Sequence, residues 1–471
     1  MKNVLIVASS PQRFLDQLHM ANELSRKSCG NIKINFFLDE QVYRQYSHVI
    51  ANFNFHVIND LSRVADVKKN INKFKDFVKK FLRPENISIL RIVVNKINSS
   101  IFFTNALFRQ EKEYLLDLEK KYIILSKLVA DNKIDVLLLN GDRHLGYEPI
   151  FLKIAKVNKI PSIVPYLVDF ADKNRLLASV SMIKINKNTL FVSRYIIKSQ
   201  ENLTYKIEEN SYYYPHPIAN ALKKFGVLTS NPYVMGCGKV DILCLNNNYY
   251  KNLYIKNGVI NKKIRVLGDI SYDRLYTRLA NKKKIKEVII KKYDLDNQKK
   301  IIVIGLPQLG EHNLLPWDQH WEEINFLVNS ACNLKQNILI SLHPKMDKNN
   351  YEFLESKFCC KILEEKLVNV LPIADLFVAS YSSTVVWSIL CGIKTIVVDF
   401  YGLNLTMYDF LISIKKLHIK DELIPVLKST LDNEVDFSMD WHNLSRDDVF
   451  DGNTIQRYIK LIESPKQFDK K

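Results

Sequence analysis

The chain is poor in the residues that build disulfide-linked, zinc-bound or glycine-rich structures. Among its 471 residues are 13 Gly, 14 Pro and seven Cys, and no two cysteines form a Cys-x-x-Cys pair. An odd number of scattered cysteines suits neither a disulfide framework nor a structural zinc site, and it favours the reduced cytoplasm. No apolar run approaches the roughly 18 residues of a membrane-spanning helix. The run at residues 4–8 is too short for a signal peptide, so we expect a cytoplasmic protein.

What the chain has in excess is positive charge. Lys and Arg number 68 against 50 Asp and Glu, which gives a formal net charge of +18, while 47% of the residues are hydrophobic. A chain of this kind can bury large cores, and a prior of roughly 150 residues per domain allows two or three domains. The surplus charge concerns partners rather than fold, and it leaves nucleic acid, an anionic membrane and an acidic substrate open.

Short apolar runs alternate with longer amphipathic segments along the chain. Such alternation predicts βα units and open, mostly parallel α/β sheets whose strands are buried on both faces. The runs form two sets, separated near Gly268 and a lysine-rich helix expected at 275–292. We expect an N-terminal domain over residues 1–270 and a C-terminal domain over residues 271–471. The expected strands are 4–8, 32–37, 136–139, 162–165, 240–245, 264–267, 301–304, 338–342, 376–379 and 395–398, and the expected helices include 12–25, 111–130, 321–333 and 385–390.

Residues 67–104 form an insert of a different character. Lysines alternate with apolar residues at helical spacing over 67–83, which predicts a basic amphipathic helix. No zinc-finger, RNP or helix-turn-helix signature accompanies this charge, so we expect no nucleic-acid partner. A solvated surface helix and a helix that lies on an anionic membrane both stay open, and the second would place the protein peripherally on the inner membrane.

The strongest chemical signal is a pair of motifs that each follow a short apolar run. The first is Leu342-His343-Pro344, at a strand end where open α/β sheets bind ligands, with a proline suited to a helix start or a rigid turn. The second is Ser382-Ser383-Thr384, which has more hydroxyls than helix capping needs. A histidine and hydroxyls aimed at one place suit a nucleotide phosphate. The alternatives are an ordinary surface histidine and a helix cap.

Two further loops complete the predicted site. One follows the strand expected at 301–304 and is neither a Walker loop nor a dinucleotide fingerprint. Its glycines allow a ligand to approach the backbone, and the residues expected at the nucleotide are Gly305, Gln308, Gly310, Glu311 and His312. The other loop follows the strand expected at 136–139 and reads Asn140-Gly141-Asp142-Arg143-His144. Asp142 is either the candidate base or a turn residue paired with Arg143.

The His-Pro and Ser-Ser-Thr motifs resemble those of bacterial GT-B sialyltransferases, polysialyltransferases and capsular Kdo transferases. The segment from Gly268 to Asp273 likewise resembles the Gly-x-x-x-x-Asp junction of UDP-GlcNAc 2-epimerases and CDP-glycerol transferases. The likeness is clearer over residues 264–402 than in the first domain. It implies a GT-B fold, which has two Rossmann-like domains with a cleft between them, and it implies that the second domain binds the nucleotide and the first the acceptor.

The resemblance also implies a role for each motif. In these families the His and Ser motifs bind the CMP moiety and an acidic residue of the first domain is the base. The family's acid-acid-Gly motif reads Asn140-Gly141-Asp142 here, which leaves Glu148 and Asp169 as reserve bases. No metal and no cofactor other than the CMP-sugar donor is expected. The residues that take these roles are His343, Pro344, Ser382, Ser383 and Thr384 at the nucleotide, Asp142 and His343 in catalysis, and Arg143, His144 and Glu148 at the acceptor.

The sequence therefore predicts a metal-independent glycosyltransferase. The expected donor is a CMP-activated sialic acid-like or Kdo-like sugar, and the expected acceptor is a bacterial surface glycan of capsule, lipopolysaccharide or O-antigen, or its lipid-linked precursor. A UDP-sugar or CDP-polyol transferase, or a 2-epimerase of the same fold, is the first alternative. A polyanion-binding protein without enzymatic activity is the second.

Overall fold

The structure is a computed structural model of the chain. It describes residues 1–50, 53, 55–58, 89–167, 183–184, 206–208, 211–212, 214–343, 346–403 and 406–465. The basic helix expected at 67–83 lies outside these residues, as do Asp169 and Pro344. Over the described part of the chain, no helix combines the length and the apolar character needed to span a membrane.

The chain forms two compact units. Unit 1 contains Met1–Leu245, Tyr250–Val266 and Ile455–Lys471, and unit 2 contains Asn246–Tyr249 and Leu267–Thr454. The expected C-terminal domain, residues 271–471, includes the last helix of the chain, which in the structure groups with unit 1. Both termini are therefore parts of the same unit.

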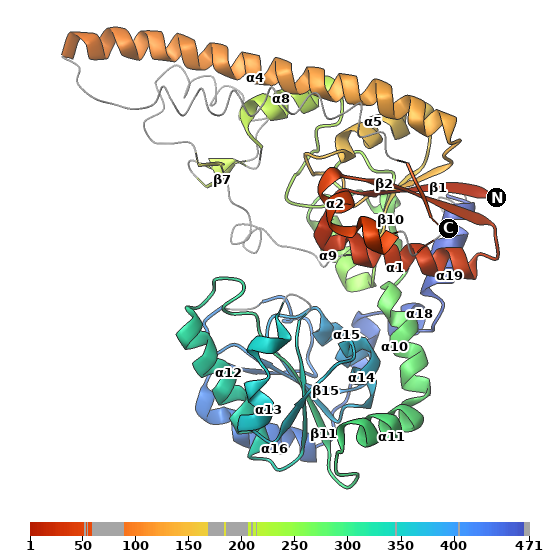
Figure 1. Cartoon of the computed structure of the whole chain (residues 1–471), viewed down its shortest axis with the longest axis vertical. Coiled ribbons are helices and arrows are strands. Elements are labelled where there is room, and N and C mark those ends of the chain that lie inside the picture. The colour runs from red at the N-terminus through yellow and green to blue at the C-terminus, as the bar shows by residue number, and fades with distance from the viewer. Residues whose placement is uncertain are drawn as a thin grey trace. The chain divides into compact units, whose positions relative to one another are not determined.

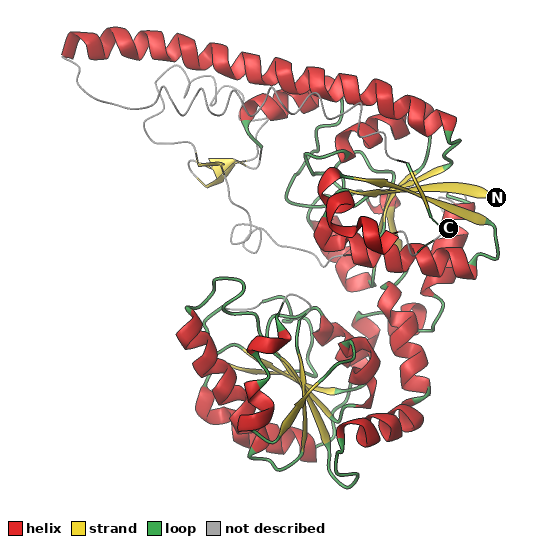
Figure 2. Ribbon diagram, viewed as in Figure 1, coloured by secondary structure: helices red, strands yellow, loops and turns green. Residues whose placement is uncertain are grey.

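Unit 1 is built on a parallel sheet whose strand order is β10-β9-β5-β4-β1-β2-β3. Helices cover both faces of the sheet (Figures 1 and 2), which explains the continuous apolar runs. Its strands are β1 (Lys2–Ala8), β2 (Ile32–Leu38), β3 (His56–Val57), β4 (Val136–Leu138), β5 (Ser162–Val164), β9 (Ile242–Leu245) and β10 (Ile264–Val266). Its helices are α1 (Pro11–Lys27), α2 (Glu40–Ile50), α4 (Ile89–Asp131), α5 (Glu148–Asn158), α8 (His216–Phe225), α9 (Asn248–Lys256), η3 (Asn261–Lys263) and α19 (Thr454–Glu463).

Unit 2 repeats this plan with a parallel sheet of order β13-β12-β11-β14-β15-β16. The central strand β11 is fully buried from Ile301 to Ile304, as expected for a strand with helices on both sides. The strands are β11 (Ile301–Gly305), β12 (Asn337–Ser341), β13 (Cys360–Ile362), β14 (Leu376–Ala379), β15 (Lys394–Val398) and β16 (Lys415–Leu417). The helices are α10 (Ile270–Ala280), α11 (Lys282–Tyr293), α12 (Trp317–Cys332), η4 (Lys348–Asn350), α13 (Phe353–Lys357), α14 (Leu367–Val370), η5 (Leu371–Ile373), α15 (Thr384–Leu390), η6 (Lys420–Glu422), α16 (Leu423–Asp432), α17 (Ser438–Asn443) and α18 (Arg446–Val449).

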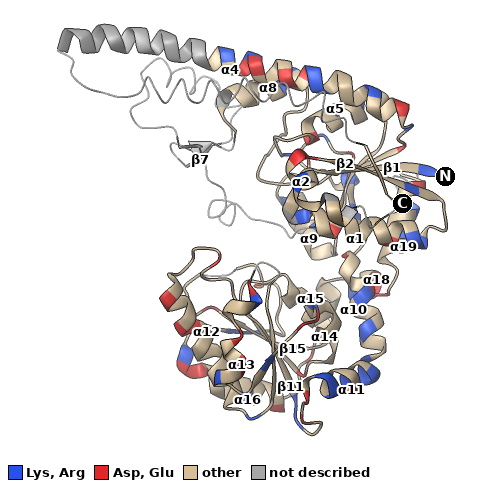
Figure 3. Ribbon diagram, viewed as in Figure 1, with Lys and Arg blue, Asp and Glu red and all other residues tan. Residues whose placement is uncertain are grey.

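The structure confirms the α/β class and all ten expected strands, and it adds elements that the sequence analysis did not predict. These are the short strands β3, β13 and β16, and a small antiparallel sheet of β6 (Ile183–Lys184), β7 (Lys206–Glu208) and β8 (Ser211–Tyr212). The single helix expected at 275–292 is two helices, α10 and α11, which meet at Asn281. Lysines follow one another along α11 (Figure 3).

A buried hydrogen bond joins the first half of unit 1 to the end of the chain, and we expect its loss to lower stability. The hydroxyl of Tyr458 in α19 accepts the backbone N–H of Tyr166, at 3.0 Å. Tyr458→Phe leaves this N–H without a partner, which costs about 1–3 kcal/mol. Urea unfolding measures the change. Tyr43→Phe, at an exposed tyrosine on α2, is the control, and equal stability of the two variants contradicts the prediction.

Candidate functional site

Both sheets have a topological switch point, where the strand order reverses beside the first strand. In unit 1 it lies between β1 and β4, and in unit 2 between β11 and β14. The loops that follow two such strands run to opposite faces of a sheet, so a crevice opens at the carboxyl ends of the strands, where open α/β sheets bind ligands. The polar loops singled out in the sequence follow β4, β11, β12 and β14. The fold therefore sets the predicted residues at the ligand-binding edge of one sheet or the other.

The side chain of Asp142, the expected base, forms hydrogen bonds within unit 1. Its side chain is 3% exposed, and its two carboxylate oxygens accept the backbone N–H groups of Gly236 (2.9 Å) and Gly238 (2.7 Å). A Cβ at residue 238 would lie 2.4 Å from the backbone oxygen of Asp142, so only glycine allows this approach. Burial raises the pKa of Asp142, while the two N–H donors and Lys263 oppose that rise. A carboxylate held in this way fixes a loop and does not suit proton transfer to a substrate.

Arg143 is likewise a structural residue. Its guanidinium donates to the backbone oxygens of Pro232 and Tyr233, and its own backbone oxygen accepts the hydroxyl of Tyr214 at 2.5 Å. His144 is half-buried beside it. Burial, with the positive charges of Arg13 and Arg143, lowers the pKa of His144 to about 3. The imidazole is therefore neutral near pH 7, and it is a weak base.

Glu148 lies at the end of a chain of hydrogen bonds that crosses the switch point of unit 1. Arg13 donates to the backbone oxygen of Asn140 (2.8 Å), the Asn140 amide donates to the Ser9 hydroxyl (3.0 Å), and Ser9 donates to Oε1 of Glu148. Within the described residues, Oε2 of Glu148 and Oδ1 of Asn140 are buried and have no hydrogen-bond partner. These two oxygens can accept hydrogen bonds from a ligand.

The environment makes Glu148 a stronger base than an ordinary glutamate. Its side chain is 1% exposed, and burial raises the pKa of Glu148, while the bond from Ser9 and the charge of Arg13 oppose that rise. The exposed Gly146 borders the free oxygen; a Cβ there would lie 3.0 Å from Oε2, so glycine leaves space beside it. Of the acidic and imidazole groups at this switch point, Glu148 fits proton abstraction best.

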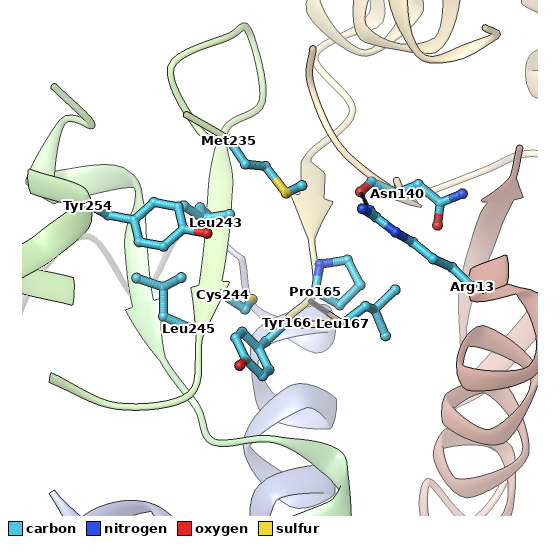
Figure 4. Close-up of a pocket in the computed structure, with 10 residues that line it drawn as sticks. All are labelled: Arg13, Asn140, Pro165, Tyr166, Leu167, Met235, Leu243, Cys244, Leu245 and Tyr254. Carbon is cyan, nitrogen blue, oxygen red and sulfur yellow. Dashed lines mark hydrogen bonds between the residues drawn. The ribbon is translucent and has the colours of Figure 1, made fainter. Parts of the chain in front are cut away.

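A small pocket opens next to this chain of hydrogen bonds (Figure 4). Arg13 and Asn140 form one side of it, and Met235, Leu243 and Tyr254 form the opposite side. The remaining lining residues come from the segment after β5 and from β9: Pro165, Tyr166, Leu167, Cys244 and Leu245. The pocket thus combines apolar side chains with one guanidinium, one amide and the two tyrosines Tyr166 and Tyr254.

In unit 2, His343 and the serine cluster lie at the carboxyl ends of two strands that flank β11. His343 follows β12 and is exposed, and its backbone N–H donates to the sulfur of Met346 at 3.2 Å. The hydroxyls of Ser382 and Thr384 bond to each other at 2.7 Å, whereas Ser383 is exposed and makes no capping bond through its side chain. The surplus of hydroxyls is therefore smaller than the sequence indicated, because two of the three are paired.

The loop after β11 divides into structural and unpaired residues. Gly305 is the last residue of β11, and a Cβ at Gly310 would lie 2.8 Å from the Trp317 ring, so this glycine serves internal packing. The Gln308 side chain is 6% exposed, and its Nε2 has no partner in the described part of the chain. His312 is exposed, and its ring lies 6.0 Å from that of Tyr381, which follows β14.

Sequence reasoning missed the residues that orient Glu311. Gly310 N–H donates to Nδ1 of His320 (3.3 Å), the opposite ring nitrogen bonds the hydroxyl of Tyr351 (2.9 Å), and that hydroxyl donates to Oε1 of Glu311 (2.5 Å). Burial lowers the pKa of His320, which keeps the ring neutral and suits these bonds. Oε2 of Glu311 stays without a partner among the described residues. No local spacing signals this network, because Tyr351 lies on a different segment.

Three buried polar atoms in the loops that follow β11 and β14 also lack hydrogen-bond partners among the described residues. They are Nε2 of Gln308, Oγ of Ser380 and the hydroxyl of Tyr381. Burial raises the pKa of Tyr381, so its phenol is neutral and can donate. Unpaired buried polar atoms are rare in folded proteins, and a group of them at a switch point indicates a ligand-binding site. Over the described ranges, no group of three or more His, Cys, Asp or Glu is suited to a metal ion.

Solved structures that are similar to this chain include glycosyltransferases and UDP-GlcNAc 2-epimerases. The calicheamicin glycosyltransferase CalG4 matches with a TM-score of 0.52 at 9% identity, over 98% of this chain and 98% of that one. The UDP-GlcNAc 2-epimerase of Neisseria meningitidis matches with a TM-score of 0.49 at 14% identity, over 98% and 100%. A glycosyltransferase of Rickettsia africae matches with 0.47 at 9% identity, over 100% and 99%. No protein-family model and no curated protein matches the sequence.

The likeness to CalG4 defines the class of fold. Two units, each with a parallel sheet in Rossmann-like order and helices on both faces, give this chain a GT-B fold. This confirms the fold that the resemblance implied. At 9% identity the likeness concerns fold alone, and the donor and acceptor stay predictions.

We expect Asp142 and Glu148 to respond differently to an amide. In Asp142→Asn, one backbone N–H of Gly236 or Gly238 meets an amide NH₂ instead of an oxygen, which costs about 1–3 kcal/mol. In Glu148→Gln the side chain keeps an oxygen for Ser9, and we expect a loss below roughly 1 kcal/mol. Urea unfolding of both variants and the wild type measures the difference. An Asp142→Asn protein as stable as the wild type refutes the structural role.

Proposed function

We propose that the protein is a glycosyltransferase that moves a sugar from a nucleotide-activated donor, bound by unit 2, to a hydroxyl of an acceptor bound by unit 1. One observation carries this proposal: buried polar atoms that lack partners in the described chain gather at the switch point of each unit. Each such atom costs free energy unless a ligand satisfies it. One cluster of unpaired polar atoms in each unit suits the binding of one polar ligand per unit. A transfer reaction needs two binding sites of this kind, one for the donor and one for the acceptor.

The proposed donor is a CMP-activated sialic acid-like or Kdo-like sugar. Its support is the resemblance of the His-Pro and Ser-Ser motifs, together with the position of His343 and Ser383, exposed at the ends of the two strands that flank β11. A phosphate can reach the exposed side chains of His343 and Ser383, while Gln308 and Tyr381 supply buried hydrogen-bond donors. The proposed acceptor, a bacterial surface glycan or its lipid-linked precursor, has the same resemblance as its support.

We propose Glu148, the first reserve, as the base in place of Asp142. Oε2 of Glu148 takes the proton of the acceptor hydroxyl while the hydroxyl oxygen of the acceptor forms a bond to the anomeric carbon of the donor sugar. The bond from this carbon to the nucleotide phosphate breaks, and the phosphate keeps the electron pair. His343 stabilises the negative charge that develops on the leaving phosphate. The hydrogen bond from Ser9 orients the glutamate, and Asn140 Oδ1 accepts a hydrogen bond from a second acceptor hydroxyl.

A nucleotide panel tests the donor. A ligand that binds only the native state raises its melting temperature with concentration, and we expect CMP to do so more strongly than UDP or CDP. Tyr381→Phe removes a buried hydroxyl without a partner in the described chain, so we expect unchanged or higher stability. The same change weakens CMP binding about 2- to 10-fold, the value of one hydrogen bond. Thermal-shift titration measures both quantities.

The control for this panel is Tyr276→Phe, at a tyrosine of α10 that is 42% exposed. Stronger protection by UDP than by CMP assigns the protein to the UDP-sugar alternative. Protection by no nucleotide contradicts the proposed function, and salt-sensitive binding of nucleic acid instead then favours the polyanion-binding alternative.

Removal of the proposed base tests the chemistry. We expect Glu148→Gln to lower the transfer rate by about 10²–10⁴ while CMP affinity stays near the wild-type value, because the nucleotide is bound by the other unit. The base must be deprotonated, so the wild-type rate rises with pH through the raised pKa of Glu148, above the ordinary value of 4.5. The variant lacks this rise. CMP release as a function of pH measures both effects.

The matched control is Glu111→Gln. Glu111 is a second buried glutamate of unit 1, 6% exposed, and its two oxygens are occupied by Lys224 and Asn220. Its amide variant changes stability but keeps the pH profile. A Glu148→Gln enzyme with full activity removes Glu148 from the mechanism, and Asp169 is then the remaining reserve base.

A further inference from the structure

The guanidinium of Arg13 is half-buried, and few groups of the described chain balance its charge or accept its hydrogen bonds. It stands in the first turn of α1, at the switch point of unit 1, and its one hydrogen bond within the described chain goes to the backbone oxygen of Asn140. No carboxylate of the described residues lies within ion-pair distance of it. A guanidinium has five N–H donors in a planar fork, so most of its capacity is unused.

The charges around Arg13 do not account for its position. Burial lowers the pKa of Arg13, the nearby Arg143 lowers it further, and the charges of Glu148 and Asp16 oppose this without restoring the ordinary value. Burial likewise raises the pKa of Glu148, so each group lacks a full counter-charge. A buried charge without a partner destabilises a fold. Its presence in a pocket therefore indicates a ligand that supplies the missing negative charge.

The pocket around the guanidinium strengthens its interaction with such a ligand. Met235, Leu243 and Tyr254 face Arg13 across the pocket (Figure 4), so largely apolar side chains lie opposite the guanidinium. An ion pair in an environment of this kind is stronger than one in water, because the local dielectric constant is lower. The fork geometry of arginine matches carboxylate and phosphate oxygens, and two parallel hydrogen bonds fix the orientation of either group.

We propose that Arg13 binds an oxyanion of the acceptor, a carboxylate or a phosphate, and that the acceptor class is therefore anionic saccharides. This inference rests on the proposed function, since it assigns the acceptor to unit 1. The hydrogen bonds from Arg13 through Asn140 and Ser9 to Glu148 connect the anion site to the base. An acceptor held by its oxyanion at Arg13 presents one hydroxyl to the unpaired oxygen of Glu148 and a second hydroxyl to that of Asn140.

The test compares two ligands that differ only in the carboxylate. Methyl β-D-glucuronide and methyl β-D-glucoside are titrated against the full-length protein by ligand-observed NMR, without any nucleotide. We expect the wild type to bind the glucuronide about 10- to 100-fold more tightly, the usual value of hydrogen bonds to a charged group. Arg13→Met abolishes this preference, and Arg13→Lys, which keeps the charge but lacks the fork, restores part of it.

Stability supplies the second readout. Removal of a half-buried cation that has no ion-pair partner among the described residues leaves the melting temperature of Arg13→Met equal to or higher than that of the wild type. Arg26→Met is the control: Arg26 is on the same helix, its side chain is 64% exposed, and it pairs with Glu23. A fall in stability for Arg13→Met well beyond that of Arg26→Met shows a structural role and overturns the proposal.

The outcomes separate this inference from the proposed function. The inference is overturned if the wild type binds glucuronide and glucoside equally and inorganic phosphate does not bind through Arg13. This result leaves the proposed nucleotide binding and sugar transfer unaffected. Arg13-dependent binding of inorganic phosphate without a preference for glucuronide assigns the oxyanion to a phosphate. Arg13-dependent glucuronide binding in a protein that binds no nucleotide supports the anion site and overturns the glycosyltransferase.

Discussion

Parallel pairing around one central strand in each unit decides where the polar side chains of this chain meet. β1 pairs with β2 on one side and with β4 on the other, and β11 pairs likewise with β12 and β14. The loop after the central strand and the loop after β4 or β14 turn to opposite faces of the sheet. The residues at the ends of these two strands therefore line the space between the two loops. Ser9 and Asn140 occupy these positions in unit 1, and Gln308 and Ser380 occupy them in unit 2. The candidate chemistry follows from strand order more than from any single motif.

The sequence predicted the fold well where burial is complete. The run at 376–379 coincides with β14, and the other expected strands agree to within a few residues, because strands covered on both faces consist of continuous apolar residues. The strands that were missed have only two or three residues, and all of them except β8 lie at sheet edges. β16, for example, reads Lys-Lys-Leu, which no periodicity distinguishes from a loop. The helix break at Asn281 was missed because basic residues continue on both sides of it, Arg274 and Arg278 before it and the lysines at 282–284 after it.

The candidate site was only partly predictable, and Asp142 and Glu148 show the reason. Both follow β4 and both are buried. The partners of Asp142 lie 94 and 96 residues further along the chain, so no local pattern reveals that its two oxygens are occupied. Glu148 begins α5 and shares only one oxygen with Ser9. Arg13 was overlooked for the same reason, since its surroundings are assembled from β4, β5 and β9. Which polar group stays unpaired is a property of the tertiary structure.

The return of α19 to unit 1 has a consequence for the order of synthesis. The backbone N–H of Tyr166 donates to the hydroxyl of Tyr458, which is synthesised 292 residues later. At a ribosomal rate of about 5–20 residues per second, the two groups are made roughly 15–60 s apart. Unit 2 ends at Thr454 and is complete before the segment that finishes unit 1 has left the ribosome. The unit that starts the chain is therefore the last to acquire all of its parts.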